Sequence, residues 1–421
     1  MSMNIIWQGY HISFIDIPAT TIIGTAIFDN SVTFALEEKI CKLLRLGERL
    51  KSLDRHDALY LLKNCFSIPR LLYVLRTSPC ISHPLLAKYD EILRRLLEYI
   101  VNTPLDEMAW LQATLPVSFG GLGIRRATDL AVPAFMSSVF SVQQSVCKVL
   151  QIENIDDVLF GTLSPSYSPP EDKSSQKAWD RLLCKRRQTE LINRTPGGSK
   201  ERARLLSATA PQSGSWLNAL PSAALGLKLD DEQLRVAVAL RIGTPICEPH
   251  HCRNCSAPVD SDGIHGLSCR LSAGRHPRHR IVNNILKQAL GSAGFPAVTE
   301  PPGLCRSDGK RPDGMTLIPW LRGRALVWDF TCTDTCAASN VEASSIAPGE
   351  AAAKAFRKKA DKYRDIFRNF IFVPVAMETP GAWAEESFNF IRELGRRIAC
   401  RTGEPRSSAF HFQRISVAVL L

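Results

Sequence analysis

The sequence lacks the features that mark a secreted or membrane-spanning protein. Its apolar N-terminal segment has no basic leader region and is interrupted by Asp16 and Pro18, so we expect strand and loop there rather than a signal peptide. No apolar run reaches the roughly eighteen uninterrupted residues that a membrane helix needs. The 13 cysteines are an odd number, which fits a reducing compartment better than a closed disulfide framework.

What is present is an ordinary globular composition with an excess of positive charge. The 421 residues are 45% hydrophobic and 22% charged, which suffices for two or three domains. The net charge of +11 and the isoelectric point near 9.1 favour an acidic partner, either nucleic acid or an anionic membrane surface. Charge alone does not choose between the two.

A predicted β-hairpin in the last third of the chain carries two acids. Apolar and β-branched residues fill 315–320 and 325–332, and a turn lies between them. Asp313 stands where the first strand begins, and Asp329 interrupts the apolar run of the second. A buried carboxylate needs a cation, a metal or a hydrogen-bond cluster, so the pair predicts an Mg²⁺ site. The alternative is that Asp313 caps a turn and Asp329 pairs with an arginine.

The segment after the hairpin predicts a lysine-rich helix over 349–370. At about 100° per residue, Lys359 flanks the apolar face, Lys362 lies further round and Lys358 points away. Lys359, and after it Lys362, is the candidate cation, which would either stabilise charge on phosphate oxygens or help to deprotonate the attacking water. A solvated basic face is the alternative. The segment 369–379 then predicts a strand parallel to the second hairpin strand.

A group of cysteines and a histidine has the spacing of a structural zinc site. Cys252 and Cys255 form a Cys-x2-Cys turn, and His265 and Cys269 complete the tetrahedral set that Zn²⁺ takes. Free cysteines in a loop are the alternative. The rival ligands nearby are Cys247, His250, His251, His276 and His279.

Basic residues in two segments are candidates for nucleic-acid binding. The first segment, a helix predicted over 173–193, follows the Ser- and Pro-rich linker 161–170, and the second begins just after the cysteines. Each contact to a phosphate would add affinity that weakens with salt. A solubilising surface helix is the alternative for the first segment. The residues proposed are Lys185, Arg186, Arg187, Arg275, Arg278 and Arg280.

Pro312-Asp313 is followed by Asp329 and then by the lysine-rich helix, and this order resembles the restriction-like PD-(D/E)xK nuclease core. The sequence KRPDG followed by VWDFT is similar to the version at the C-terminal end of the polyprotein of some non-LTR (LINE-type) retrotransposons. The resemblance implies cleavage of one DNA strand, whose 3′ end primes reverse transcription, with Asp313 and Asp329 on the metal. Thr331 departs from the motif, which has lysine there. The lysine would come from the following helix, or else the core is inactive.

A second resemblance covers 61–79 and 110–135, which look like the region after the palm of retrotransposon reverse transcriptases. In that family a Cys-Cys-His-Cys knuckle lies just ahead of the nuclease, as here. The aromatic-x-Asp-Asp hairpin that binds the catalytic metals of the polymerase is absent from the sequence. We therefore expect the C-terminal part of a longer polyprotein, which does not polymerise DNA by itself.

These resemblances imply a mixed α plus α/β architecture in four segments. They are a helical, thumb-like post-palm region over 1–165, a basic helical linker region over 166–245, a zinc knuckle over 246–280, and a restriction-like endonuclease domain with a central mixed sheet over 281–421. The expected cofactors are Mg²⁺ and Zn²⁺, with DNA and RNA as partners and no membrane or small-molecule cofactor. The expected compartment is the nucleus, with the cytoplasm as the alternative. The alternative function is a catalytically inactive, retrotransposon-derived nucleic-acid-binding protein, and a genomic relic is a third.

Overall fold

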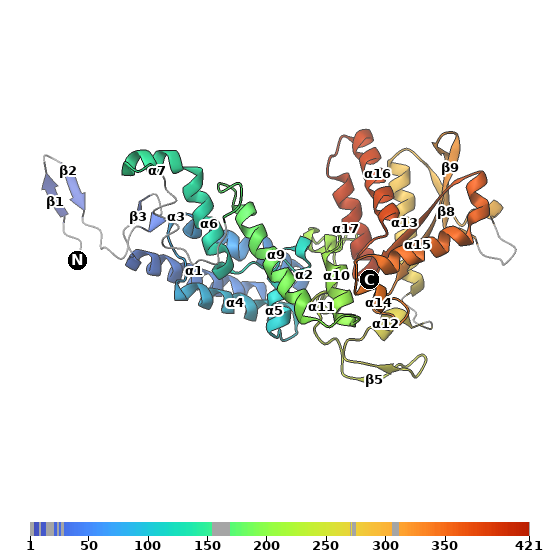
Figure 1. The fold of residues 1–421 in the computed structure, drawn as a ribbon, viewed down its shortest axis with the longest axis horizontal. Coiled ribbons are helices and arrows are strands. Elements are labelled where there is room, and N and C mark those ends of the chain that lie inside the picture. The colour runs from blue at the N-terminus through green and yellow to red at the C-terminus, as the bar shows by residue number, and fades with distance from the viewer. Residues whose placement is uncertain are drawn as a thin grey trace. The chain divides into compact units, whose positions relative to one another are not determined.

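A computed structural model of the chain describes residues 4–7, 10–13, 21–22, 25–26, 29–153, 169–269, 271, 275–304 and 311–420. The contacts divide the chain into two compact units (Figure 1). The N-terminal unit comprises residues 1–53, 61–100 and 124–188, and the C-terminal unit comprises 54–60, 101–123 and 189–421. The four segments predicted from the sequence stay predictions. Most of the predicted linker 161–170 lies outside the described residues.

The N-terminal unit is mainly helical, with two short antiparallel strand pairs ahead of the helices. Its elements are β1 (Asn4–Trp7), β2 (Tyr10–Ser13), β3 (Thr21–Ile22), β4 (Thr25–Ala26), α1 (Asp29–Leu50), η2 (Leu62–Phe66), α3 (Ile68–Thr77), α4 (Pro84–Val101), α6 (Ala127–Ser141), α7 (Gln143–Leu150) and α9 (Gln176–Arg194), whose last residues belong to the other unit.

A small core in this unit joins α6 to α9. Phe140 of α6 stacks on Trp179 of α9 with ring centroids 6.3 Å apart. The buried carboxylate of Asp90 on α4 accepts from the backbone N–H groups of Ala127 and Thr128, at 2.6 and 3.1 Å. It thereby satisfies two donors that the first turn of α6 leaves without helical partners.

One helical stretch of the described residues, Arg55–Thr77, is long and apolar enough to cross a membrane, and the bent pair formed by α6 and α7 passes the same test when taken together. Core helices also pass, and 44% of the 18-residue window within the first stretch is buried. Length and composition are therefore weak evidence, and the absence of a membrane partner stays a prediction.

The C-terminal unit combines helices with the sheet that carries the two predicted acids. Its elements are α2 (Arg55–Leu61), α5 (Glu107–Ala113), η3 (Val117–Phe119), α10 (Lys200–Thr209), η5 (Ser215–Asn218), α11 (Asp231–Ile242), β5 (His250–His251), β6 (Pro258–Val259), α12 (His265–Ser268), α13 (Arg275–Ser292), β7 (Ala297–Thr299), η6 (Pro302–Leu304), β8 (Gly314–Leu321), β9 (Arg324–Thr333), α14 (Val341–Ser344), α15 (Glu350–Lys362), η7 (Arg364–Arg368), β10 (Ile371–Glu378), α16 (Glu385–Thr402) and α17 (Ser407–Leu420).

The sheet has the strand order β10-β9-β8-β7. Strands β7, β8 and β9 are antiparallel neighbours, whereas β10 runs parallel to β9 after the crossover through α15. The predicted hairpin and the predicted parallel strand are thus both confirmed, and so is the mixed character of the sheet.

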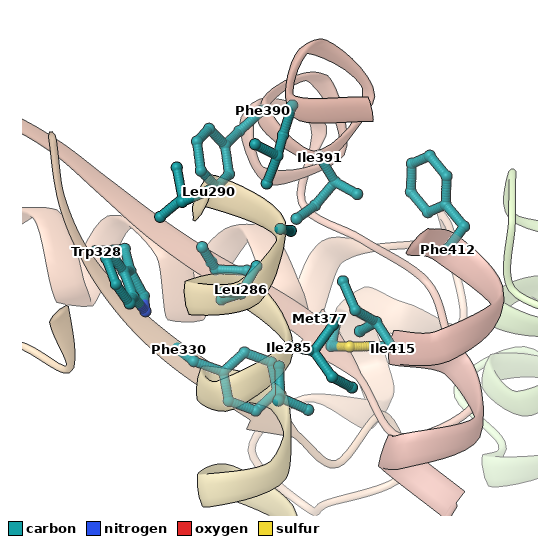
Figure 2. Close-up of a cluster of buried hydrophobic side chains, with 14 of the residues drawn as sticks. Ile285, Leu286, Leu290, Trp328, Phe330, Met377, Phe390, Ile391, Phe412 and Ile415 are labelled. Carbon is teal, nitrogen blue, oxygen red and sulfur yellow. The ribbon is translucent and has the colours of Figure 1, made fainter. Parts of the chain in front are cut away.

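Alternate residues of β9 face two different helical layers, because successive side chains of a strand point to opposite faces. Trp328 and Phe330 pack into the large core with α13, α16 and α17 (Figure 2). Val327 packs with Tyr363 and Phe372 on the opposite face. Asp329, two residues after Val327, belongs to this second face, where α15 also packs on the sheet.

The predicted lysine helix is shorter than expected. It ends at Lys362, and the 3₁₀ turn η7 follows in place of the continuation to residue 370. Tyr363 leaves the helical conformation with φ −110° and ψ 27° while its ring stays buried and its hydroxyl donates to the carbonyl of Arg311 at 3.0 Å. The buried tyrosine therefore sets the end of the helix.

Candidate active site and metal centre

Asp329 is the buried acid of the site. Its residue is 2% exposed, and the ammonium of Lys359 on α15 donates to its Oδ1. Burial raises the pKa of Asp329, and the nearby carboxylate of Asp313 raises it further, whereas Lys359 and the hydroxyl of Tyr363 lower it. The buried charge thus has a cation beside it, which is what burial of a carboxylate demands.

Asp313 lies one residue before β8, and its side chain continues the hydrogen-bond pattern between β8 and β9. Its backbone N–H donates to the carbonyl of Trp328 at 3.0 Å, and its Oδ2 accepts from the backbone N–H of Phe330 at 2.6 Å. The paired register of β8 begins only at Gly314, so the carboxylate replaces a strand carbonyl there. A Cβ on Gly314 would come within 2.1 Å of the Trp328 ring, which explains the glycine after the acid.

His279 on α13 is a site residue that the sequence analysis listed only as a rival zinc ligand. Its Nε2 lies 3.1 Å from Asp313 Oδ2 and 3.2 Å from the carbonyl oxygen of Phe330. The hydrogen bond to Asp313 raises the pKa of His279, and burial opposes the rise. No local signal marks this role, because the two residues meet only through the packing of α13 on the sheet.

A cleft of about 410 Å³ opens beside these groups. Its lining includes Arg278, His279, Thr331, Asp334, Asn340 and Lys359. Thr331, at the position where the simple motif has lysine, therefore faces the same space as the lysine that α15 brings. The cations Arg278 and Lys359 and the hydroxyl of Thr331 suit a ligand with phosphate oxygens, whereas the carboxylate of Asp334 does not.

Lys362 makes a different contact from Lys359. Its ammonium donates to the hydroxyl of Tyr363 at 2.9 Å, and Tyr363 in turn interacts with Asp329. Lys358 is exposed, in agreement with the predicted helical faces. Of the three lysines, Lys359 is the one for which the structure gives a direct contact with a predicted acid.

Glu378, at the end of β10, is a buried acid that sequence reasoning did not single out. Its Oε1 accepts from the backbone N–H groups of Ala351 and Ala352, at 3.0 and 3.3 Å, and its Oε2 accepts from the hydroxyls of Ser207 and Thr335, at 2.8 and 2.7 Å. Burial raises its pKa while these four bonds lower it. The carboxylate fixes the first turn of α15, the helix that carries Lys359.

The predicted zinc ligands come together. The ligand atoms of Cys252, Cys255, His265 and Cys269 all lie within 4.8 Å of one another, and no second group of three or more such side chains is found within the described ranges. Cys255 Sγ lies 3.1 Å from His265 Nε2, and Cys252 Sγ lies 3.9 Å from Cys269 Sγ. This Cys₃His set fits Zn²⁺ by number and kind of donor.

None of the five rival ligands belongs to the clustered group, and three of them make other contacts. The thiol of Cys247 donates to the carbonyl of Asp260 at 3.5 Å, and His250 Nδ1 lies 2.8 Å from the carbonyl oxygen of Glu248. His279 belongs to the Asp313 site. The choice of four ligands made from the spacing is therefore the one that the fold brings together.

Local backbone bonds shape the metal centre. The N–H of Ser256 donates to the carbonyl of Cys252 at 2.8 Å and closes the turn after β5. Backbone N–H groups of Asn254 and Cys255 lower the pKa of Cys252 to about 6, which favours the thiolate that zinc requires. The short helix α12 carries His265 and leads to Cys269. Bound Zn²⁺ would tie this helix to the β5–β6 hairpin and supply folding free energy to the segment.

The predicted nucleic-acid contacts lie in both units. Lys185 and Arg186 are exposed on α9, and Arg187 lies 3.4 Å from Asp129. Arg278 lines the cleft, and Arg280 is exposed. The side chain of Arg275 lies outside the described residues.

Sequence similarity to known proteins bears on the origin of this chain. No protein-family model matches the chain. The chain is 27% identical over 340 residues to the retrotransposable element SLACS 132 kDa protein of Trypanosoma brucei gambiense. This similarity supports a retrotransposon-derived protein. The alignment covers 78% of the chain and 25% of that relative, so the chain spans about a quarter of its length.

Proposed function

We propose that this retrotransposon-derived chain belongs to the non-LTR class and that its C-terminal unit is a restriction-like, metal-dependent DNA endonuclease. It would nick one strand of target DNA, and the new 3′ end would prime reverse transcription by a polymerase whose active-site motif this chain lacks. The observation that carries the proposal is the contact of Lys359 with Asp329. The crossover helix α15 thereby brings a lysine to the acid pair. Thr331, at the usual position of that lysine, cannot provide the positive charge.

The topology supports the same proposal. An antiparallel hairpin that carries both acids, a crossover helix and a parallel strand β10 follow one another, and α13 covers the other face of the sheet. The residue after Asp329, Phe330, donates its backbone N–H to Asp313 Oδ2, and the carboxylate of Asp313 raises the pKa of Asp329, so we propose that the two acids share a cation.

Mg²⁺ fits this donor set, because it is commonly held by one or two carboxylates with waters and substrate phosphate in the other positions. Both described contacts of the Asp313 carboxylate use Oδ2, so Oδ1 is the oxygen proposed to face the ion. Bound Mg²⁺ would polarise the phosphate and lower the pKa of the attacking water.

The side chains of the protein would do the remaining work. Lys359 would neutralise the charge that develops on the phosphate oxygens while it stays within reach of Asp329. Thr331 lines the cleft and would donate to the same phosphate, and Arg278 would add charge at its edge. Lys362 is proposed as the second lysine of the site, acting through Tyr363.

The test is nicking of supercoiled plasmid by the whole chain in the presence of Mg²⁺. Asp313→Ala and Asp329→Ala proteins and an EDTA control accompany the wild type. Asp361→Ala is the matched control, because Asp361 is an exposed acid of α15 whose partner is Arg364. We expect nicking that needs metal, survives Asp361→Ala and is lost in both other variants. Metal-independent nicking, or nicking that the two variants retain, would contradict the proposal.

The second candidate is a catalytically inactive nucleic-acid-binding protein. Thr331 favours it, and so does the direct pairing of Lys359 with Asp329, since such a pair also satisfies a buried acid without any catalysis. A zinc-loaded, folded protein that retards DNA in a gel and does not nick it would establish this alternative. DNA and RNA are the proposed partners under both functions, and the nucleus is the proposed compartment.

A further inference from the structure

His279 is held in one orientation by a relay of hydrogen bonds that begins in the core. The indole Nε1 of Trp328 donates to Oδ1 of Asn283 at 3.0 Å. An indole N–H can only donate, so the amide oxygen of Asn283 faces Trp328 and its Nδ2 faces His279. Nδ2 lies 3.1 Å from His279 Nδ1, which must therefore accept.

This relay decides what the other ring nitrogen does. With Nδ1 as the acceptor, Nε2 carries the proton in the neutral ring and donates toward Asp313 Oδ2 and the carbonyl oxygen of Phe330. If the ring were protonated on both nitrogens, its Nδ1–H would face the N–H of the Asn283 amide. The amide would then have to turn and lose its bond to Trp328.

We infer that His279 is a positioning residue for Asp313. Together with the backbone N–H of Phe330 it places two donors on Oδ2, which fixes the carboxylate plane and leaves Oδ1 for a divalent cation. The inference rests on the proposed function, because it assigns the cation to the same acid pair. Groups that orient a ligating carboxylate contribute to metal affinity although they do not touch the metal.

The position of the ring agrees with this role. The side chain of His279 is 41% exposed and lines the cleft, so it is not a core residue kept for packing. Its ring lies against Phe330 with centroids 5.6 Å apart, which limits its rotation. The three side chains of the relay come from α13 and β9, so the core of the C-terminal unit sets the orientation of the acid.

The experiment measures Mn²⁺ binding to the whole, zinc-loaded chain without DNA, from the electron paramagnetic resonance signal of free Mn²⁺. His279→Leu removes the donor and keeps bulk, whereas His279→Gln can place an amide N–H near the position of Nε2. The wild type should bind Mn²⁺, and Asp313→Ala should abolish that binding. We expect His279→Leu to weaken binding about 10- to 100-fold and His279→Gln to stay within about threefold of the wild type.

His276→Ala is the matched control, since His276 is an exposed histidine at the start of the same helix, and it should leave binding unchanged. Equal Mn²⁺ affinity of the wild type and a folded His279→Leu protein would overturn the inference. So would a wild type that binds no Mn²⁺. Binding that follows the expected order in a protein that never nicks DNA would support the inference and contradict the nuclease, so the two proposals fail separately.

Discussion

Lys359 on α15 donates to Asp329 on β9, and 30 positions of sequence separate the two. Asp329 points to the face of the sheet on which α15 packs, and the carboxylate of Glu378 holds the first turn of that helix. The lysine thus reaches the acid from a different element than in the simple motif, in which it would occupy position 331.

The first prediction follows from this displaced lysine. Lys359→Met should reduce Mg²⁺-dependent nicking by about 10²- to 10³-fold, because the charge on the phosphate oxygens loses its cation. Lys358→Met is the control, since that lysine is exposed on the neighbouring face of α15 and should not matter. The double variant Thr331→Lys/Lys359→Met returns a lysine to the same cleft and should recover part of the rate. Equal activity of Lys359→Met and the wild type would show that Lys359 takes no part in the mechanism.

The second prediction concerns stability rather than activity. Lys359→Met leaves the 2% exposed Asp329 without its cation, and we expect the free energy of unfolding near pH 7 to fall by about 3 kcal/mol in urea denaturation. Asp329→Asn/Lys359→Met removes both charges and should regain most of that loss while remaining inactive. Equal stability of the single and the double variant would mean that the pair is not coupled.

The sequence predicted those features whose signal is local. The hairpin, the parallel strand after the lysine helix and the four clustered metal ligands follow from alternation, crossover handedness and ligand spacing. In each of the three features, the residues are close in sequence or belong to one βαβ unit. The same reasoning selected Lys359 above Lys358 from the period of the helix.

The features that it missed depend on contacts between distant segments. His279 was read as a possible zinc ligand because it stands near the cysteines, and only the packing of α13 takes it to Asp313. Glu378 gave no signal, since its partners Ser207 and Thr335 belong to other segments. Helix α17 was not predicted, although Phe412 and Ile415 complete the core of the C-terminal unit. The end of the lysine helix was placed too late because the buried ring of Tyr363 stops it.

The third prediction concerns the Cys₃His centre. Protein purified without chelator should contain one zinc per chain by mass spectrometry of the metals, and Cys252→Ser should lose it. Cys247→Ser is the control, because its thiol donates to the carbonyl of Asp260 and lies outside the cluster. Loss of zinc should increase hydrogen exchange across residues 246–269, since few apolar groups hold this segment. A Cys252→Ser protein with full zinc content would show that other ligands bind the metal.

The fourth prediction is a dependence of stability on pH that originates at His56. His56 is buried, its Nδ1 accepts from the backbone N–H of Leu229 at 3.0 Å, and burial lowers its pKa to about 4. Asp57 raises this pKa and Lys228 lowers it. The unfolded chain therefore binds a proton at His56 between about pH 6.5 and 4, where the folded chain does not. The stability from the neutral ring is present above about pH 6.5 and is lost as the pH falls to 4.

His56→Asn isolates this contribution, because the amide oxygen can accept from Leu229 in place of Nδ1 and does not titrate. His411 is also buried with its pKa lowered to about 4, and it remains in both proteins, as do all carboxylates. Both proteins should therefore lose stability in acid, and the difference between their free energies of unfolding should change by about 3 kcal/mol from pH 7 to pH 4. Parallel curves over this range would mean that His56 takes up its proton equally well in the folded and the unfolded chain.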